Sequence, residues 1–299
     1  MKHLHCVIIG DANIDIITTL EQTDLKENPC FHSRITTSVG GNGIFFCEAA
    51  KEAGFSSVQL LCSLGCDLAA EEILAYCQRK KLSLINYPSR KQTGKAIILY
   101  KPDDKRILIA DRGANEDFLI GEKELPSGMI NSANILHISG YHLLSMAQSE
   151  AVATLAKAFI KNGAFVVFDT VPHDIYERIG WDEYLKRCVY ANAIIAEATT
   201  IAGFMGADPG HVSPDDLADF LLGSFRLCIV RLNALSDFLI ADRNHRTTLR
   251  VYYRPQLSSL RFSDRVAAFV LQKYLDDPQG LFASPTWADE MNLAIGEKE

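Results

Sequence analysis

Apolar and polar positions alternate with two different periods along the chain. Four short, almost continuous apolar runs are separated by segments long enough for helices, a pattern typical of buried parallel strands connected by helices. These runs lie at residues 135–138, 165–168, 193–196 and 227–230. Between residues 82 and 110 the period changes to two, and β-type runs at 95–100 and 106–110 flank the turn residues Pro102-Asp103-Asp104. With a similar run at 33–39, the pattern predicts an α/β body that carries a small antiparallel sheet.

Polar residues follow the first predicted strand, at residues 5–10. The sequence Gly10-Asp11-Ala12-Asn13-Ile14-Asp15 places Asn13 and Asp15 two residues apart, so in an extended segment both side chains point to the same face. A carboxylate and an amide in such a pair can recognise the paired hydroxyl groups of a polyol. The alternative is that Asp11, Asn13 and Asp15 only form Asx turns after the strand.

A glycine-rich turn, Gly40-Gly41-Asn42-Gly43, precedes a helix predicted to continue to about residue 52. Glycines at this spacing let the backbone approach a ligand closely. The alternative is a tight turn that needs a positive φ and has no ligand nearby. Both interpretations stay open on the sequence alone.

Composition and charge argue against a disordered, a nucleic-acid-binding or a membrane-spanning protein. The 299 residues are 48% apolar and 22% charged, with a net charge of −7, which argues against disorder and disfavours nucleic acid as the main partner. No apolar run approaches the ~20 residues that span a bilayer, and the N-terminus lacks the apolar core of a signal peptide. None of the eight cysteines has C-x-x-C spacing. We therefore expect reduced thiols in a cytoplasmic protein without a membrane partner.

Five short motifs, in this order, resemble the ribokinase-like (PfkB) carbohydrate kinase family. They are Gly10-Asp11-Ala12-Asn13-Ile14-Asp15, Gly40-Gly41-Asn42-Gly43, Leu64-Gly65-Cys66-Asp67, Gly113-Ala114-Asn115 and Phe168-Asp169. The resemblance covers most of the chain and implies a three-layer α/β sandwich, with helices on both faces of a mostly parallel central sheet. It also implies a single ribokinase-like domain, residues 1–299, with a discontinuous β lid at roughly residues 12–42 and 82–115.

The resemblance further implies a site for a sugar or nucleoside and a base for phosphoryl transfer from ATP with Mg²⁺. The substrate-binding residues that it implies are Asn13, Asp15, Gly40, Gly41, Asn42, Asn115 and Asp169. Asp264 aligns with the carboxylate that deprotonates the acceptor hydroxyl, at the start of a helix predicted over residues 264–275. The alternative interpretation of Asp264 is an ordinary acidic residue in the first turn of that helix. A last helix is predicted at residues 284–295.

The nucleotide side departs from the pattern of the family. There, a G-A-G-D turn opens a helix and its glycine amides bind the transferring phosphoryl group; here the turn is Arg261-Phe262-Ser263-Asp264. The N-x-x-E motif that organises Mg²⁺ becomes Glu197-Ala198-Thr199-Thr200, which leaves Glu197 as the candidate metal ligand. The T-x-G motif becomes Arg231-Leu232-Asn233, and the sequence ends about one helix and one strand before the adenine pocket would be complete. The candidate ligands for nucleotide phosphates are therefore Arg231, Asn233, Arg261 and Ser263.

Arginines are concentrated between residues 242 and 265, where six arginines accompany two aspartates. One interpretation is an anion site in which guanidinium groups replace the lost backbone donors. A second is a solvated β-hairpin with scattered arginines, and a third is nucleic-acid binding, which the net charge of −7 disfavours.

Three functions remain open at this point. The first is a divergent sugar or nucleoside kinase that uses ATP and Mg²⁺. The second is a catalytically inactive pseudokinase that binds a small polyol or sugar phosphate in a regulatory role and uses no cofactor. The third is a scaffold whose lid surface binds another protein. The resemblance also implies a homodimer, because lids of this kind often pair across two copies and exposed lid strands supply the edge for such pairing.

Overall fold

The structure is a computed structural model that describes residues 2–19, 33–101, 106–233, 237–251 and 259–283, except for the side chains of residues 259–261. The chain divides into two compact units. The larger unit comprises residues 1–9, 45–59 and 119–299, and the smaller unit comprises residues 10–44 and 60–118. Both segments predicted as a β lid fall within the smaller unit, which also includes residues 60–81.

Five parallel strands form the centre of the larger unit. They are β1 (His5–Ile9), β8 (Ile135–Ser139), β9 (Phe165–Asp169), β10 (Ala193–Glu197) and β11 (Leu227–Arg231), hydrogen-bonded in the order β11-β10-β9-β8-β1. All five residues of β8 are buried, and burial on both faces explains the unbroken apolar runs of these strands. The four strands predicted from those runs are confirmed. The sheet continues through the antiparallel strands β12 (Asp237–Asp242) and β13 (Arg246–Arg250) at one end, and through β4 (Ser57–Cys62) and β5 (Ser83–Asn86) at the other.

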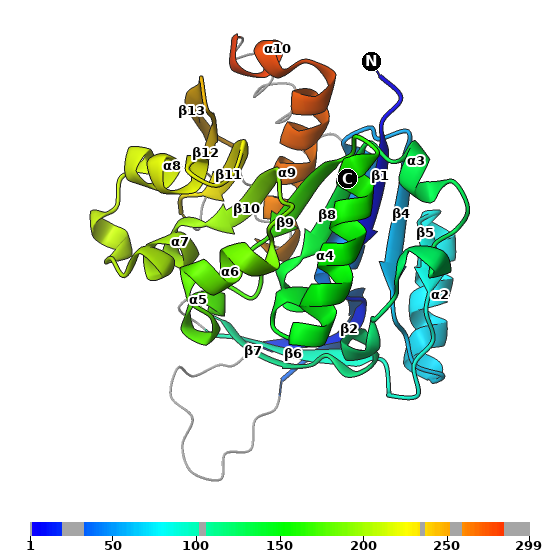
Figure 1. The fold of residues 1–299 in the computed structure, drawn as a ribbon. Coiled ribbons are helices and arrows are strands. Elements are labelled where there is room, and N and C mark those ends of the chain that lie inside the picture. Colours follow the sequence, from blue (N-terminus) through cyan, green and yellow to red (C-terminus); the bar gives the residue numbers. More distant parts are fainter. Residues whose placement is uncertain (1, 20–32, 102–105, 234–236, 252–258, 284–299) are drawn as a thin grey trace. The chain divides into compact units, whose positions relative to one another are not determined.

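Helices lie on both faces of the sheet of the larger unit, as the green α4 and the orange α9 show on opposite sides of it (Figure 1). The α-helices of the two units together are α1 (Asn42–Glu52), α2 (Leu68–Lys80), α3 (Met129–Ser132), α4 (Met146–Lys161), α5 (Ile175–Arg178), α6 (Trp181–Arg187), α7 (Ala198–Met205), α8 (Pro214–Leu222), α9 (Ser259–Asp276) and α10 (Pro278–Ala283), of which α2 lies in the smaller unit. Short 3₁₀ helices lie at Gly113–Asp117, Glu122–Glu124, Gly140–Leu143 and Pro209–His211. Among the described helices, none is long and apolar enough to cross a membrane.

The smaller unit contains a four-stranded sheet. Its strands are β2 (Asn13–Thr19), β3 (Ile35–Gly40), β6 (Gly94–Tyr100) and β7 (Arg106–Asp111), in the order β3-β2-β6-β7. The pairs β2–β3 and β6–β7 are antiparallel, but the central pair β2–β6 is parallel. The expectation of a purely antiparallel sheet is therefore wrong. Turn residues predict only local hairpins, whereas the chain between β2 and β6 is long enough to return the second strand in the same direction.

Helix α9 spans Ser259–Asp276 and so does not begin at Asp264 as predicted. The buried residues Phe262, Val266 and Val270 are spaced four apart and form one apolar face, so the amphipathic pattern of the helix already includes residue 262. No glycine remains at 261 or 263 to favour a turn there. The last predicted helix, at residues 284–295, lies outside the described residues.

Candidate functional site

Asn13 and Asp15 are the first and third residues of β2, so their side chains share one face of the four-stranded sheet. Asp15 is buried, whereas Asn13 is partly exposed. In the register of the sheet, Asn13 lies opposite Gly40 on β3 and Gly94 on β6. Asn13 and Asp15 therefore lie on a regular strand, and neither is in an Asx turn.

Two glycines make room for this pair. A Cβ atom on residue 40 would overlap the Asp15 carboxylate. A Cβ atom on residue 94 would lie 2.5 Å from Oδ1 of Asn13 and 2.7 Å from Nδ2 of Asn115. Glycine at both positions is therefore explained by the polar side chains of β2 and the 3₁₀ turn, which need the space that a methyl group would take.

The turn of residues 40–43 packs against the end of the first strand. Gly41 has a φ of +96°, which favours glycine, and a Cβ there would overlap the carbonyl oxygen of Asp11. The backbone N–H of Gly43 donates to that same oxygen at 3.0 Å, and Oδ1 of Asn42 accepts from the N–H of Asp11 at 3.0 Å. The turn thus joins β3 and α1 to the segment that leads into β2.

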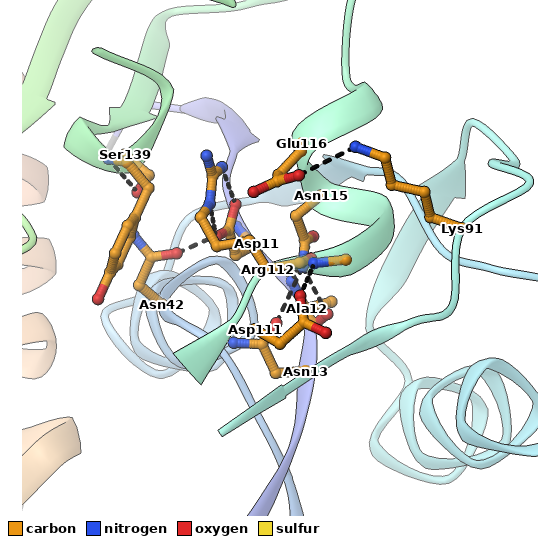
Figure 2. Close-up of polar contacts among 12 residues, drawn as sticks. Asp11, Ala12, Asn13, Asn42, Lys91, Asp111, Arg112, Asn115, Glu116 and Ser139 are labelled. Carbon is orange, nitrogen blue, oxygen red and sulfur yellow. Dashed lines mark hydrogen bonds and ion pairs between the residues drawn. The ribbon is translucent and has the colours of Figure 1, made fainter. Parts of the chain in front are cut away.

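Asn115 is buried, and its side-chain amide contacts the start of β2 and Arg112 (Figure 2). Its Oδ1 accepts from the N–H of Ala12 at 3.1 Å. Its Nδ2 shares two hydrogens among three acceptors, the carbonyl oxygens of Ala12 and Arg112, both at 3.1 Å, and Oδ1 of Asn13 at 2.9 Å. Asn115, which the resemblance implies as a substrate ligand, therefore makes hydrogen bonds to protein atoms through both Oδ1 and Nδ2.

The sequence does not single out Arg112. Its Nε donates to Oδ2 of Asp11 at 2.8 Å and its Nη2 donates to Oδ1 at 2.9 Å, which is the two-point geometry of a strong arginine–carboxylate pair. Only 13% of the Arg112 side chain and 3% of the Asp11 side chain are exposed. No local spacing signals this pair, because about a hundred residues separate its members.

Asp67, from the G-C-D motif, has a structural role. Its side chain caps α2 by accepting from the N–H of Ala70 at 2.9 Å. It also accepts from the N–H and the hydroxyl of Thr93, at 2.8 and 2.7 Å. Although burial acts to raise it, these hydrogen bonds hold the pKa of Asp67 below its usual value. Asp67 thus anchors the residue that precedes Gly94 and β6.

A second group of predicted residues meets at the ends of the parallel strands in the larger unit. Glu197 ends β10 and lies opposite Arg231, which ends β11. Nη1 of Arg231 lies 3.5 Å from Oε1 of Glu197 and 3.2 Å from Oγ of Ser263, and its Nε donates to the carbonyl oxygen of Asn233 at 3.1 Å. Four of the predicted nucleotide-side residues are therefore in contact. The side chain of Arg261 lies outside the described residues.

Asp169 ends β9, the strand next to β10. Burial raises the pKa of its carboxyl group to about 7, and the charge of Glu197 adds to the rise, while a hydrogen bond from the N–H of Thr170 opposes it. A carboxyl group that titrates near neutrality can hold or release a proton under physiological conditions.

Asp264 lies in the second turn of α9. Only the first four N–H groups of an α-helix are free of intrahelical hydrogen bonds, so the N–H groups of Ser263 and Asp264 are used within the helix. The backbone at these two positions therefore has no donors to offer a phosphoryl group, in contrast to a glycine turn that opens a helix.

The described residues do not fit a Mg²⁺ site at Glu197. The carboxylate of Glu197 lies near two potential cations, Arg231 and His173, whose Nε2 is 3.6 Å away. Thr200 stands where the motif has its glutamate, and its buried hydroxyl donates to the carbonyl oxygen of His173 at 2.9 Å. Across the described part of the chain, no group of three or more His, Cys, Asp or Glu side chains could hold a metal ion.

Three arginines of the stretch 242–265 form ion pairs with carboxylates. Arg246 contacts Asp215 at 3.1 Å and also Asp219. The remaining pairs are Arg250 with Asp237 at 2.8 Å and Arg265 with Glu52 at 2.9 Å. These pairs favour the solvated hairpin over an anion site. Arg254 lies outside the described residues.

The chain resembles solved structures over nearly its whole length. An adenosine kinase from Sinorhizobium meliloti superposes with a TM-score of 0.78 at 14% identity, covering 92% of this chain and 88% of that one. A ribokinase from Giardia lamblia gives 0.74 at 15% identity, with 98% and 91% covered. A fructokinase from Xylella fastidiosa with bound ATP gives 0.71 at 15% identity, with 97% and 89% covered.

At such identities these likenesses show the fold alone, and they confirm the predicted ribokinase-like α/β fold with its mostly parallel sheet. The sequence has no significant match among curated proteins. The family model described as pfkB family carbohydrate kinase matches residues 3–222. This match covers well over half of the sequence and confirms the resemblance, so the chain belongs to the PfkB carbohydrate kinase family.

Proposed function

We propose that this protein is a divergent sugar or nucleoside kinase, which binds a polyol in its smaller unit and slowly transfers the γ-phosphoryl group of ATP to a hydroxyl of that polyol. The observation that carries the proposal is the arrangement at the start of β2. Asn13 and Asp15 share one face, and Gly40 and Gly94 leave the space that their side chains need. Side chains placed in this way suit a ligand with neighbouring hydroxyl groups.

Asp15 contributes acceptor oxygens and a negative charge to such a site. A polyol hydroxyl that donates to a buried carboxylate makes a charge-assisted hydrogen bond, which is roughly twice as strong as a neutral one. The backbone at Gly40 and Gly41 and the side chain of Asn42 complete the proposed site in the smaller unit. Asp169, at the end of β9, is proposed separately as a substrate ligand.

Asp264 is proposed as the base that removes the proton of the acceptor hydroxyl. ATP supplies the phosphoryl group when it is bound, and Arg231, Asn233, Arg261 and Ser263 are proposed to contact its phosphates. Arg231 and Ser263, which are 3.2 Å apart, have the donor groups that an anion requires. Since the loss of a single backbone donor costs ~3 kcal/mol in such sites, we expect a rate about 10²–10³-fold below that of a kinase with the glycine turn.

A second candidate function is a pseudokinase that binds a polyol or sugar phosphate and transfers nothing. Two observations favour it. The Arg231 guanidinium already contacts Glu197 and Ser263, and Asp264 lies inside α9 rather than at its first residue. Both features weaken the nucleotide side without changing the arrangement of Asn13 and Asp15.

Thermal unfolding and product analysis distinguish the two candidates. Adenosine, ribose and fructose are each tested with and without ATP and Mg²⁺, and phosphorylated product is detected by mass spectrometry. A kinase predicts a stabilising shift by one polyol and a product that disappears in Asp264→Asn but persists in Asp276→Asn, a matched change at the end of α9. A polyol shift with no ATP shift and no product supports the pseudokinase. The lack of a shift or product with any polyol contradicts both.

A homodimer through the smaller unit is also proposed. Ile35, Ile97 and Ile109 are 67%, 37% and 55% exposed, and Ile97 lies opposite Ile109 in the sheet register. An exposed apolar sheet face of this kind is typical of an interaction surface. Sedimentation of the wild type and of Ile97→Lys tests the proposal, since a dimer that uses this face dissociates in the variant. A wild-type mass of one chain contradicts it.

The cytoplasm is the proposed compartment. The seven cysteines in the described part of the chain form no disulfide, and all of them except Cys66 are buried. Reduced thiols are typical of cytosolic proteins. Localisation of a tagged chain by cell fractionation tests this proposal.

A further inference from the structure

Asn115 and Ala12 make two hydrogen bonds to each other. The N–H of Ala12 donates to Oδ1 of Asn115 and the carbonyl oxygen of Ala12 accepts from Nδ2, both at 3.1 Å. A backbone N–H can only donate and a backbone carbonyl can only accept. The backbone of Ala12 therefore determines which end of the Asn115 amide is oxygen and which is nitrogen.

The orientation of Asn115 in turn determines that of Asn13. Nδ2 of Asn115 is a donor, so the Asn13 atom 2.9 Å away must be its acceptor Oδ1. The amino group of Asn13 is then directed away from Asn115. The backbone of Ala12 thus orients the Asn115 amide, and the Asn115 amide in turn determines that Asn13 presents its amino group on the side away from Asn115.

The surroundings of Asn115 leave it little freedom to turn. The residue is 1% exposed, and its Nδ2 has a third acceptor in the carbonyl oxygen of Arg112 at 3.1 Å. Rotating the amide by half a turn would place its oxygen against three acceptor oxygens and its nitrogen against the N–H of Ala12. Every one of these contacts would become repulsive.

We propose that Asn115 is a positioning residue that makes Asn13 a hydrogen-bond donor toward the ligand, beside the acceptor Asp15. This inference rests on the proposed polyol site and adds a specificity rule to it. The ligand must offer an acceptor to Asn13 and a donor to Asp15. Two neighbouring hydroxyl groups meet that requirement, because each can donate or accept.

The direct test is carried out without ligand, so that it does not depend on the proposed function. Side-chain amide order parameters of Asn13 are measured by NMR in the wild type, in Asn115→Ala and in Asn192→Ala. Asn192 is a matched control in the larger unit, a buried asparagine whose Oδ1 accepts from the N–H of Val166 at 2.8 Å. We expect the order parameter of the Asn13 amide to be about 0.85, a rigid value, in the wild type and the control. In Asn115→Ala we expect an order parameter below about 0.6. An Asn13 amide that stays equally rigid in Asn115→Ala overturns the proposal.

Asn115→Asp is the second variant, for use if the alanine variant does not fold. In its ionised form the carboxylate can still accept from Ala12 but cannot donate to Asn13, so the Asn13 amide must turn and present Oδ1. Since a protonated carboxyl group could still donate, the titrations are run at pH 8. We then expect the Kd of whichever test polyol binds the wild type (adenosine, ribose or fructose) to rise about tenfold or more, the effect of losing one hydrogen bond. The Kd in Asn192→Ala is expected to stay within about twofold.

The outcomes separate the two proposals. Equal Kd values in Asn115→Asp and the wild type overturn the positioning role. If none of the three polyols binds the wild type while the Asn13 amide is mobile only in Asn115→Ala, the positioning role holds and the proposed polyol site fails.

Discussion

Arg112 binds Asp11 through two parallel hydrogen bonds of 2.8 and 2.9 Å, and both side chains are largely buried. The pair joins the residue before the 3₁₀ helix Gly113–Asp117 to the segment that leads into β2. The carbonyl oxygen of Arg112 also accepts from Asn115. The pair therefore supports the same short segment from which Asn13 and Asp15 extend.

Removal of Arg112 leaves the Asp11 carboxylate buried without its partner. We expect Arg112→Ala to lower the free energy of unfolding by about 3–5 kcal/mol, measured by urea denaturation. The double variant Asp11→Asn, Arg112→Ala is expected to recover part of that loss, because no buried charge remains. A single variant as stable as the wild type would show that the pair contributes nothing to folding.

His137 makes the protein sensitive to acid. It is fully buried in β8 and stacks on Phe46, with 3.6 Å between the ring centres, and burial lowers its pKa to about 3 from 6.5. Between pH 6.5 and 3 the unfolded chain therefore binds a proton that the folded chain does not. His137 contributes a loss of stability as pH falls through this window, of at most about 1.4 kcal/mol per pH unit.

The variant His137→Leu should lack this contribution. Both ring nitrogens of His137 lack a hydrogen-bond partner in the described structure, so the change removes no hydrogen bond. Urea denaturation between pH 4 and 7 measures the slope of stability against pH. Identical slopes in the variant and the wild type would contradict the assignment.

Asp169 has the opposite effect in an overlapping window. Because its folded pKa is raised from 3.8 to about 7, the folded chain keeps a proton that the unfolded chain loses between these values. Its contribution to stability is full below pH 4 and is lost as pH rises to 7. We expect Asp169→Asn to remove this loss and to be more stable than the wild type at pH 7 but not at pH 4. A variant that is less stable at both pH values would contradict the raised pKa.

Gly40 is expected to tolerate no side chain. Because a Cβ there would overlap the Asp15 carboxylate, we expect Gly40→Ala to cost about 1–3 kcal/mol of stability and to weaken polyol binding. Gly180→Ala is the matched control, since no atom lies within 4 Å of a Cβ at that position. The melting temperatures of the two variants give the comparison. Equal effects would show that the space beside Asp15 does not matter.

Much of this architecture follows from local pattern. The strands β8 to β11 are predicted because burial on both faces requires unbroken apolar runs, and Asn13 and Asp15 are predicted to share a face because they are two residues apart on a strand. Contacts between segments that are far apart in the sequence cannot be predicted from local pattern. The Arg112–Asp11 pair, the Asp67–Thr93 contact and the parallel pairing of β2 with β6 depend on how the chain returns, which no local period records.

The predicted start of α9 is wrong for a different reason. The resemblance predicts a helix start at Asp264, because the related motif has glycines before its aspartate and a glycine turn interrupts a helix. In this chain Phe262 extends the buried face of α9, and Arg261 and Ser263 are compatible with a helix. Replacement of the glycines thus changes the local backbone, as well as the size of the side chains.

The central claim is that the smaller unit binds a polyol through Asp15 and Asn13. The most direct measurement is calorimetric titration of the wild type and of Asp15→Asn with adenosine, ribose and fructose. The account predicts that at least one polyol binds the wild type, and that its Kd rises tenfold or more in Asp15→Asn, about 1.4 kcal/mol or more. Binding of none of the three to the wild type, or equal Kd values in both proteins, would contradict it.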